Sequence, residues 1–239
     1  MSHQTHFGKS VLAPRSKFYQ GPFGRICPNL DPWVPPGTTE EQDAGFLEFA
    51  TKNMVELPGS TPTEIAQDQS TIDELESKFG SQIPAGYTYF GQFVDHDITL
   101  DTTSLTAREI DPDQIKNFRT PRLDLDCVYG RGPGDQPYLY EFDSKGKFTG
   151  ELLVGTVAGT NLKDLPRNQQ GRALIGDMRN DENSMVSQLQ LAFILAHNEL
   201  VERADAQGAS DAFSAARKSL TRLYQWVVWN DLIKRIAID

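Results

Sequence analysis

The chain has 239 residues, of which 38% are hydrophobic and 10% aromatic, as expected for a soluble globular protein with a sizeable core. Its 23 basic and 33 acidic residues give a net charge of -10, which argues against general attraction to nucleic acid or to an anionic membrane surface. The two cysteines, Cys27 and Cys127, are too few for a disulfide framework or a thiolate zinc site.

We expect both cysteines to be ordinary free thiols, with one disulfide as the lesser alternative. The amino terminus lacks the apolar centre of a signal peptide, and no stretch is long and apolar enough for a membrane-spanning helix. A cytoplasmic location is therefore the default expectation, and export without a cleaved signal is the alternative.

Along the chain, residues 1–37 are rich in glycine, proline and basic side chains, which predicts an extended arm. Thr38 and Glu41 then have the spacing of a capping box, which predicts a helix from Thr38 to about residue 52. The same spacing recurs at the start of a second, shorter helix predicted over residues 71–79.

The remaining elements are mostly helical. Residues 86–100 are largely apolar and predict a third helix, and residues 137–154 have the pattern of a surface β-hairpin. Residues 183–206 are apolar nearly all round, as in a buried helix, and residues 211–236 follow with apolar side chains three and four apart. The predicted fold class is mainly α, with long loops and one small β-hairpin.

The third predicted helix contains the stretch GQFVDHDITLD, which places much ionisable chemistry in an apolar segment. At helical spacing Gln92, Asp95 and His96 share one face, while Asp97 points elsewhere. A half-buried helix with capping acids and a core histidine is the simpler interpretation. Burying these polar groups without partners costs about 2 kcal/mol or more each, and this favours a functional site.

The stretch TPRLDLDCVYG, residues 120–130, is the second polar motif. In an extended strand alternate residues face the same way, so Thr120, Asp124 and Asp126 can converge on a hard cation. Calcium prefers six to eight oxygen ligands of this kind. Taken alone, the motif fits a solvated acidic loop equally well, but Asp97 is available to complete a ligand shell.

The stretch GDMRNDEN, residues 176–183, precedes the long buried helix. Acids are favoured in the first turn of a helix by its dipole, so Asp181 and Glu182 fit that position, and Arg179 could pair with them. Taken alone, the motif favours this structural interpretation. The functional alternative makes Arg179 a fixed positive charge at a site where negative charge develops.

In this order, the three motifs resemble the animal-type haem peroxidases of the peroxidase-cyclooxygenase superfamily, in particular its bacterial members. GQFVDHD is similar to the distal helix of that family, TPRLDLDCVYG to its calcium loop, and GDMRNDEN with the following FILAHNEL to its arginine segment. The resemblance implies that residues 38–239 are the distal half of a haem peroxidase domain.

The resemblance also implies roles for the polar residues. His96 would exchange a proton with hydrogen peroxide at a bound haem b, Arg179 would stabilise developing charge, and Gln92 would orient peroxide or a small anion. Asp95 and Glu182 match positions that form ester links to haem in the family. The expected reaction is peroxide reduction coupled to oxidation of an organic or halide donor.

The resemblance also implies a calcium ion at a second set of positions. The bound ion would brace the distal helix. Its ligands would be Asp97, Thr120, Arg122 through its carbonyl, Asp124 and Asp126. At one haem-linking position the chain departs from the family, because Asn183 stands where some members have a methionine that forms a sulfonium link. A third covalent link to haem is therefore excluded.

The family also supplies a proximal histidine ligand to the iron, well beyond the arginine segment. The histidines of this chain are His3, His6, His96 and His197, and none matches that motif. His197 matches a structural position of the family. We therefore expect a chain cut before the proximal ligand, which by itself binds haem poorly.

Three rival functions remain open. A haem fatty-acid dioxygenase uses the same scaffold, and its radical tyrosine would also lie beyond this chain. A metal phosphohydrolase could use His96, Asp97 and His197, but this leaves the other motifs without a role. A calcium-binding helical module without catalysis is the third. The oligomeric state is not specified by the sequence, and Trp226 and Trp229 are expected in the core.

Overall fold

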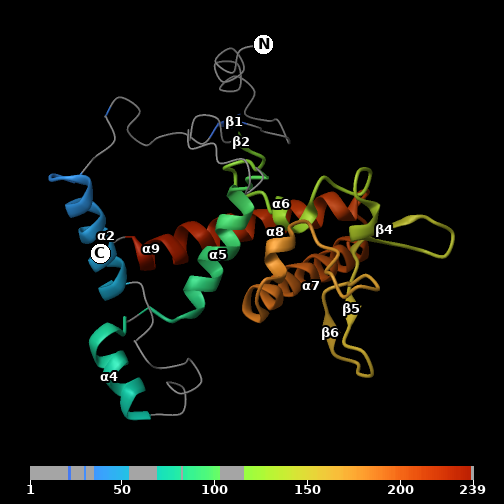
Figure 1. The fold of residues 1–239 in the computed structure, drawn as a ribbon. Helices are drawn as coiled ribbons and strands as arrows, with labels where there is room; N and C mark the ends of the chain where they lie inside the picture. Colours follow the sequence, from blue (N-terminus) through green and yellow to red (C-terminus); the bar gives the residue numbers. More distant parts are fainter. Residues whose placement is uncertain are drawn as a thin grey trace. The chain divides into compact units, whose positions relative to one another are not determined.

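A computed structural model describes residues 21–22, 30, 35–53, 69–81, 83–102 and 116–237 (Figure 1). The arm predicted over residues 1–37 lies mostly outside the described residues, as does Cys27. The chain divides into two units, one formed by residues 25–84 and the other by residues 1–24 together with 85–239. Each unit is considered by itself.

The unit of residues 25–84 contains helices α2 (Thr39–Asn53) and α4 (Gln69–Phe79). The predicted capping box is present, because the Thr38 amide donates to Glu41 Oε2 at 2.8 Å and the Glu41 amide donates to Thr38 Oγ1 at 3.3 Å. The prediction for α2 is thus confirmed. The predicted start of α4 was two residues late, since the helix already includes Gln69, whose side-chain amide donates to Asp73 at 2.7 Å.

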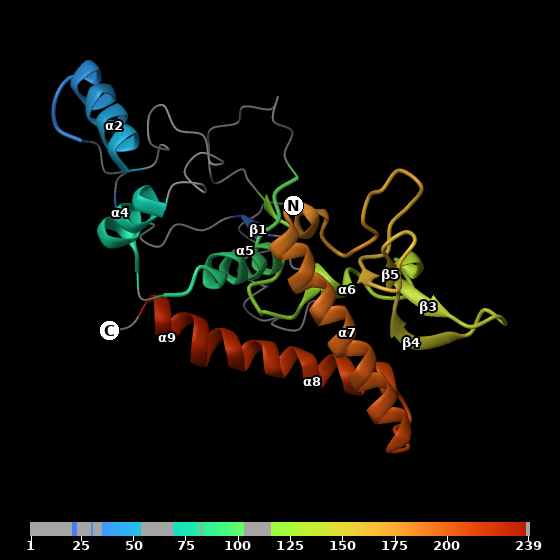
Figure 2. The ribbon, with the colours of Figure 1, turned by 90° about the horizontal axis from the view of Figure 1, so that it is seen from below.

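The other unit contains most of the described helices and all three polar motifs. Helix α7 packs against α8, α5 and strand β4. Figure 2 shows α8 and α9 as one continuous rod that crosses α7. Within the described part of the chain, no helix is both long and apolar enough to cross a bilayer. The helices are α5 (Gly86–Ile98), α6 (Asp126–Tyr129), α7 (Ser184–Ala206), α8 (Ala212–Val227), the π-helical segment η4 (Val228–Leu232) and α9 (Ile233–Ile236).

Helix α7 begins where the sequence predicted, because Asn183 is its N-cap and its side-chain oxygen accepts from the Val186 amide at 3.0 Å. The placement of Asp181 and Glu182 in its first turn was wrong. Asp181 belongs to the short 3-10 helix η3 (Met178–Asp181), and Glu182 follows that helix. The chain turns sharply between η3 and α7, which leaves both acids before the N-cap.

Among the described residues the strands form three short antiparallel pairs, so the prediction of one hairpin was incomplete. The predicted hairpin is confirmed as β3 (Tyr140–Phe142) and β4 (Phe148–Leu152), which follow the 3-10 helix η2 (Pro137–Leu139). The mainly α class is also confirmed. The additional pairs are β1 (Gly21–Pro22) with β2 (Lys116–Asn117) and β5 (Gly155–Thr156) with β6 (Lys163–Asp164).

The stretch 120–130 is not the extended strand that the sequence suggested. It forms turns and then the short helix α6, with Leu123 and Leu125 in the left-handed region at φ 54° and 60°. Such a conformation is uncommon for residues other than glycine. Its physical reason is Asp97, whose carboxylate accepts the amides of Leu125 at 3.1 Å and Cys127 at 3.3 Å and so curls the chain around itself.

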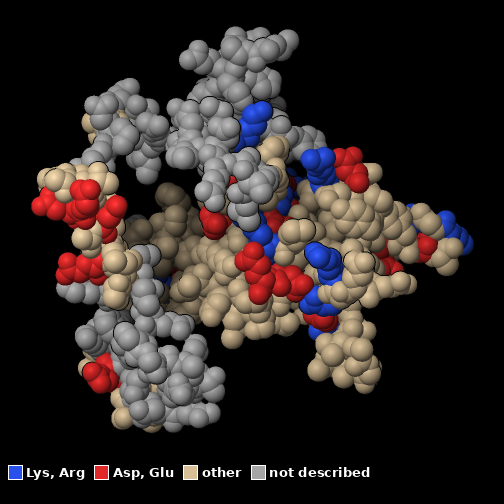
Figure 3. Space-filling model, in the orientation of Figure 1, with Lys and Arg blue, Asp and Glu red and all other residues tan. Residues whose placement is uncertain are grey.

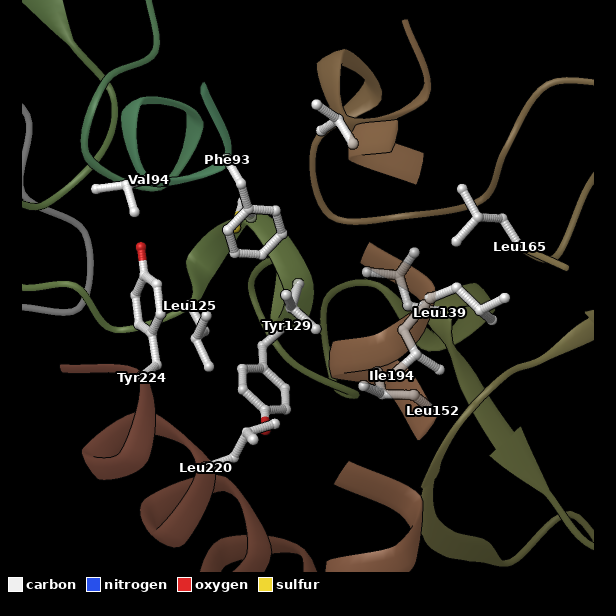
Figure 4. Close-up of a cluster of buried hydrophobic side chains, with 14 of the residues drawn as sticks. Phe93, Val94, Leu125, Tyr129, Leu139, Leu152, Leu165, Ile194, Leu220 and Tyr224 are labelled. Atoms are coloured by element: carbon white, nitrogen blue, oxygen red, sulfur yellow. The ribbon is translucent and has the colours of Figure 1, made fainter. Parts of the chain in front are cut away.

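The hydrophobic core lies where α5, α6, α7 and α8 meet, and it holds the polar residues of α5 in place. Figure 4 shows Tyr224 of α8 pointing toward Val94 and Leu125. Phe93 is fully buried and stacks on Phe193 at 4.7 Å between ring centroids. Burial of a side chain of this size stabilises the fold by about 2 kcal/mol.

The prediction that Trp226 and Trp229 are core residues was wrong, because they are 61% and 66% exposed. The buried face of the same rod is formed by Tyr224, Val228 and Leu232. Helical periodicity identifies an apolar stripe but does not say which of two apolar faces meets the core.

Candidate functional site

Helix α5 directs its polar side chains to two different places, as helical spacing predicted. Gln92 lies against the junction of η3 and α7, where its Nε2 donates to Glu182 Oε2 at 3.4 Å and its Oε1 accepts from Asn183 Nδ2 at 3.3 Å. His96 contacts the same segment through Asn180. Asp97 instead contacts the turn before α6. Two of the predicted motifs thus meet on one side of α5, and the third motif lies on the other.

His96 is buried, with 5% of its surface exposed, and among the described residues its ring has one hydrogen-bond partner, Asn180, which is also buried. Its Nδ1 lies 2.7 Å from Asn180 Oδ1, and Asn180 Nδ2 donates to Gln190 Oε1 at 2.8 Å. Asn180 and Gln190 are both fully buried. The imidazole is therefore held in one orientation by a chain of side-chain hydrogen bonds.

Arg179 is fixed at the carboxyl end of α5. Its Nε donates to Asp177 Oδ1 at 3.0 Å, and its Nη2 donates to Asp177 Oδ2 at 2.8 Å and to the His96 carbonyl at 3.2 Å. It also donates to the Thr99 carbonyl. The suggested pairing of Arg179 with its neighbouring acids was wrong for Asp181, which accepts from Arg167 at 2.7 and 2.9 Å.

The pKa of Arg179 is raised above its ordinary value. Burial acts to lower this pKa, but the hydrogen bonds and charge of Asp177 outweigh burial, and the charges of Asp95 and Glu182 add to the effect. Asp95 and Glu182 are themselves exposed. Figure 3 shows acidic and basic side chains next to one another in the middle of the face that it draws. Arg179 thus remains a positive charge throughout the physiological pH range.

The acids assigned to calcium gather on the other side of α5. Asp97 is fully buried, and burial followed by the charge of Asp124 raises its pKa to about 6. Burial, Asp124 and Asp97 raise the pKa of Asp126 to about 7, against the opposing effect of Arg217 and Arg119. These carboxylates therefore carry repulsion that a bound cation would relieve.

The donor set is nevertheless not arranged as a ligand shell. Among the described residues, no group of three or more His, Cys, Asp or Glu side chains is placed to hold a metal ion. Both oxygens of Asp97 accept backbone amides, and the Arg122 carbonyl accepts from Gln225 Nε2 at 3.0 Å. Thr120 donates to Asp124 Oδ2 at 2.9 Å, while Asp124 Oδ1 is buried without a hydrogen-bond partner. Calcium binding stays a prediction.

Four residues at these sites were missed by sequence reasoning: Arg119, Asp177, Asn180 and Gln190. Asp177 bridges two arginines, because its Oδ2 also accepts from Arg119 Nη2 at 2.7 Å. Asp177 and Asn180 lie within the quoted motif, and an acid two residues before an arginine was an available signal. Arg119 and Gln190 had no local signal, since Arg119 pairs with Asp177 58 positions away and Gln190 is one of several polar residues of α7.

His197 has a structural environment, as expected. It is fully buried, its Nδ1 lies 2.9 Å from the Tyr129 hydroxyl, and its Nε2 lies 3.0 Å from the Gly150 carbonyl. These contacts are separate from those of His96. A metal phosphohydrolase site built on both histidines therefore has no support in this geometry. Cys127 is a buried free thiol, as predicted.

Comparison with known proteins adds little to this geometry. No family model matches the chain, and no curated protein matches it. Among solved structures, the chain is similar to a fatty acid alpha-dioxygenase from Arabidopsis thaliana, with 21% sequence identity and a TM-score of 0.49. The similarity covers 66% of this chain and only 28% of that chain. At this level, the likeness carries no information about activity.

Proposed function

We propose that this chain forms the distal side of a haem-dependent peroxidase that reduces hydrogen peroxide and oxidises an organic or halide donor. The carrying observation is contact between α5 and the arginine segment: Gln92 donates to Glu182, and Arg179 donates to the backbone carbonyl of His96, although more than 80 positions separate each pair in sequence. The resemblance of the three motifs to animal-type haem peroxidases supports the same conclusion.

The residues present fit a haem group on the side where Gln92 and His96 lie. Nδ1 of His96 is occupied by Asn180, which leaves Nε2 to face a ligand, and the exposed carboxylates of Asp95 and Glu182 are accessible to an ester link. When bound, haem would supply the iron at which the O–O bond of peroxide is cleaved. His96, Asp95 and Glu182 would hold or contact the group from this side.

Each residue then has a defined task. His96 would take a proton from hydrogen peroxide at Nε2, hold it, and return it. Such transfer by a positioned side chain contributes about 10²–10⁴-fold to a rate. Arg179 stabilises the negative charge that develops on the departing oxygen, and its raised pKa keeps it charged. The amide of Gln92 orients the peroxide.

The test combines haemin titration with peroxide-dependent oxidation of guaiacol, on this chain and on the longest open reading frame that contains it. We expect weak haem binding by this chain alone, and for the longer reading frame a Soret band and a turnover that falls about 100-fold in His96→Ala with binding retained. Arg203→Ala, which removes an exposed arginine, is the control. Equal turnover in His96→Ala and in the unchanged protein would contradict the proposal. Oxygen uptake with linoleate and no peroxidase turnover would favour the dioxygenase.

We also propose that Ca²⁺ binds at Asp97, Thr120, Asp124, Asp126 and the Arg122 carbonyl. The proposal is supported by the unpartnered buried oxygen of Asp124 and by the raised pKa values of Asp97 and Asp126. Binding requires the turn to rearrange, because Asp97 now accepts two backbone amides. A bound ion would tie α5 to this turn.

Thermal unfolding with and without Ca²⁺ tests the calcium site. At a concentration 100 times the dissociation constant, calcium adds about 2.7 kcal/mol to stability, which raises the melting temperature by several degrees. Asp124→Asn should abolish most of this shift, whereas Glu202→Gln, which changes an exposed acid of α7, should leave it intact. No shift in the unchanged protein would exclude the site. A calcium shift without a Soret band would favour the non-catalytic module.

A further inference from the structure

Three polar side chains from separate elements form a buried chain that ends at His96. His96 comes from α5, Asn180 from η3 and Gln190 from the second turn of α7. The links are 2.7 Å from His96 Nδ1 to Asn180 Oδ1 and 2.8 Å from Asn180 Nδ2 to Gln190 Oε1. All three residues are more than nine-tenths buried. The atoms that link the three side chains are paired, whereas Gln190 Nε2 is buried without a hydrogen-bond partner among the described residues.

The direction of the hydrogen bonds follows from the chemistry of the amides. A carbonyl oxygen accepts hydrogen bonds and an amide nitrogen donates them. Asn180 donates to Gln190 through Nδ2, so its Oδ1 faces His96. Because this oxygen is an acceptor, the hydrogen between the two side chains must belong to His96 Nδ1. In the neutral imidazole the other nitrogen, Nε2, is then the unprotonated one.

We propose that Asn180 and Gln190 are positioning residues that fix His96 in its Nδ1–H tautomer, so that Nε2 is the nitrogen that accepts and returns the proton. The inference deepens the proposed function and rests on it for its catalytic meaning. Gln190 acts on His96 through Asn180, because its Oε1 determines which way the Asn180 amide faces. Neither residue touches substrate.

The arrangement suits a group that must alternate between base and acid. When Nε2 takes up a proton, the imidazolium still donates from Nδ1 to the same oxygen of Asn180. The neutral and charged forms of His96 therefore use an identical network, and no amide has to rotate during the cycle. Preorganisation of this kind avoids reorganisation at the moment of proton transfer.

The tautomer is measured directly by NMR of the chain labelled with ¹⁵N-histidine, through the couplings of each ring nitrogen to the carbon-bound protons. The His96 signals are assigned by their loss in His96→Gln. His197 is an internal reference with the opposite tautomer, because its Nε2 faces the Gly150 carbonyl and its Nδ1 faces the Tyr129 hydroxyl. We expect Nδ1–H at His96 and Nε2–H at His197.

Variants separate positioning from simple structural support. Asn180→Leu removes the acceptor and should shift His96 to the Nε2–H form that free imidazole side chains prefer, while Asn180→Asp keeps an acceptor and should retain Nδ1–H. Gln190→Leu should give a mixture of both forms, and it decides the matter if Asn180→Leu does not fold. Asn198→Leu is the matched control, since Asn198 bonds the backbone of Leu152 and does not contact His96.

The inference is overturned if His96 carries its hydrogen on Nε2 in the unchanged protein, or if Asn180→Leu and Gln190→Leu both leave Nδ1–H unaltered. The NMR experiment needs neither haem nor peroxide, so it separates this inference from the proposed function. The expected tautomer without peroxidase turnover would mean that the proposed function alone fails. Turnover with the opposite tautomer would mean that the positioning role alone fails.

Discussion

At the scale of single residues, the surroundings of His197 favour one charge state. Burial lowers the pKa of His197 to about 4, against a raising effect of the Gly150 carbonyl and with a smaller lowering effect of Arg217. The neutral ring fits its two partners, since Nε2 donates to the carbonyl and Nδ1 accepts from Tyr129. A proton added at Nδ1 would reverse the second bond, with the Tyr129 hydroxyl oxygen as the acceptor.

This environment predicts a loss of stability in acid. The ordinary histidine pKa is about 6.5, so between about pH 6.5 and 4 the unfolded chain binds a proton that the folded chain does not. The contribution of His197 is complete above pH 6.5 and declines as the pH falls, by up to about 3 kcal/mol. Urea unfolding of the unchanged protein and of His197→Gln between pH 4 and 7.5 measures this. Identical pH dependence of the two proteins would contradict it.

At the scale of elements, Asn183 links the start of α7 to the candidate site. Its Oδ1 caps the helix by accepting from Val186, and its Nδ2 donates to Gln92. One residue thus sets both the beginning of a 23-residue helix and the orientation of an amide on α5.

Replacing Asn183 by alanine should lower the free energy of unfolding by about 1 kcal/mol, the usual effect of losing an N-cap. It should also lower peroxide-dependent turnover, because Gln92 loses a partner. Asp211→Ala is the matched control, since Asp211 caps α8 through Ser214 and has no contact with Gln92. Urea midpoints and turnover of both variants give the comparison. A fall in turnover of the same size in Asp211→Ala would mean that stability alone accounts for the effect.

Local signals predicted elements well wherever the determinants lie within one turn of chain. The Thr38–Glu41 capping box and the Asn183 cap are contacts over three residues, and each marks the start of the predicted helix. The turn around Leu123 and Leu125 was misread as a strand, because Asp97, some 28 positions away, holds it. No alternation of residue types in the turn itself could reveal that contact.

At the scale of the whole unit, Asp177 joins distant parts of the chain. It accepts hydrogen bonds from Arg119 and Arg179, and Arg119 also donates to the carbonyls of Asp126 and Gly176. Burial acts to raise the pKa of Asp177, but the hydrogen bonds and charges of the two arginines prevail and lower it. The carboxylate is thus ionised at neutral pH and compensates two partly buried cations.

Asp177→Asn should be strongly destabilising, by about 3 kcal/mol, because it leaves buried arginine charge without its partner. Glu199→Gln is the comparison, since its ion pair with Arg203 is exposed and should contribute less than about 1 kcal/mol. Denaturant unfolding of the two variants measures both. Equal losses of unfolding free energy in the two variants would show that burial does not strengthen the Asp177 ion pairs.

The residues of the candidate site that belong to the three motifs could be predicted from the sequence. Gln92 contacts Glu182, Arg179 donates to the backbone carbonyl of His96, and the carboxylates of Asp97 and Asp124 interact. The supporting residues were not predictable, because Gln190 is one of many polar residues of α7 and only packing selects it. The sequence therefore indicates the reactive residues of the candidate site, whereas the structure is needed to identify the residues that orient them.

The π-helical segment Val228–Leu232 makes the last helical rod intolerant of changes in length. A π turn contains one residue more than an α turn, and each residue rotates the helix by about 100°. Asp231, within this turn, accepts from the Tyr87 hydroxyl of α5 at 2.7 Å. Loss of one codon here would leave a regular helix, yet turn Asp231 away from Tyr87 and change the face that the rod presents to α5. Insertions and deletions of one residue are thus tolerated in the surface loops but not in this π-helical segment.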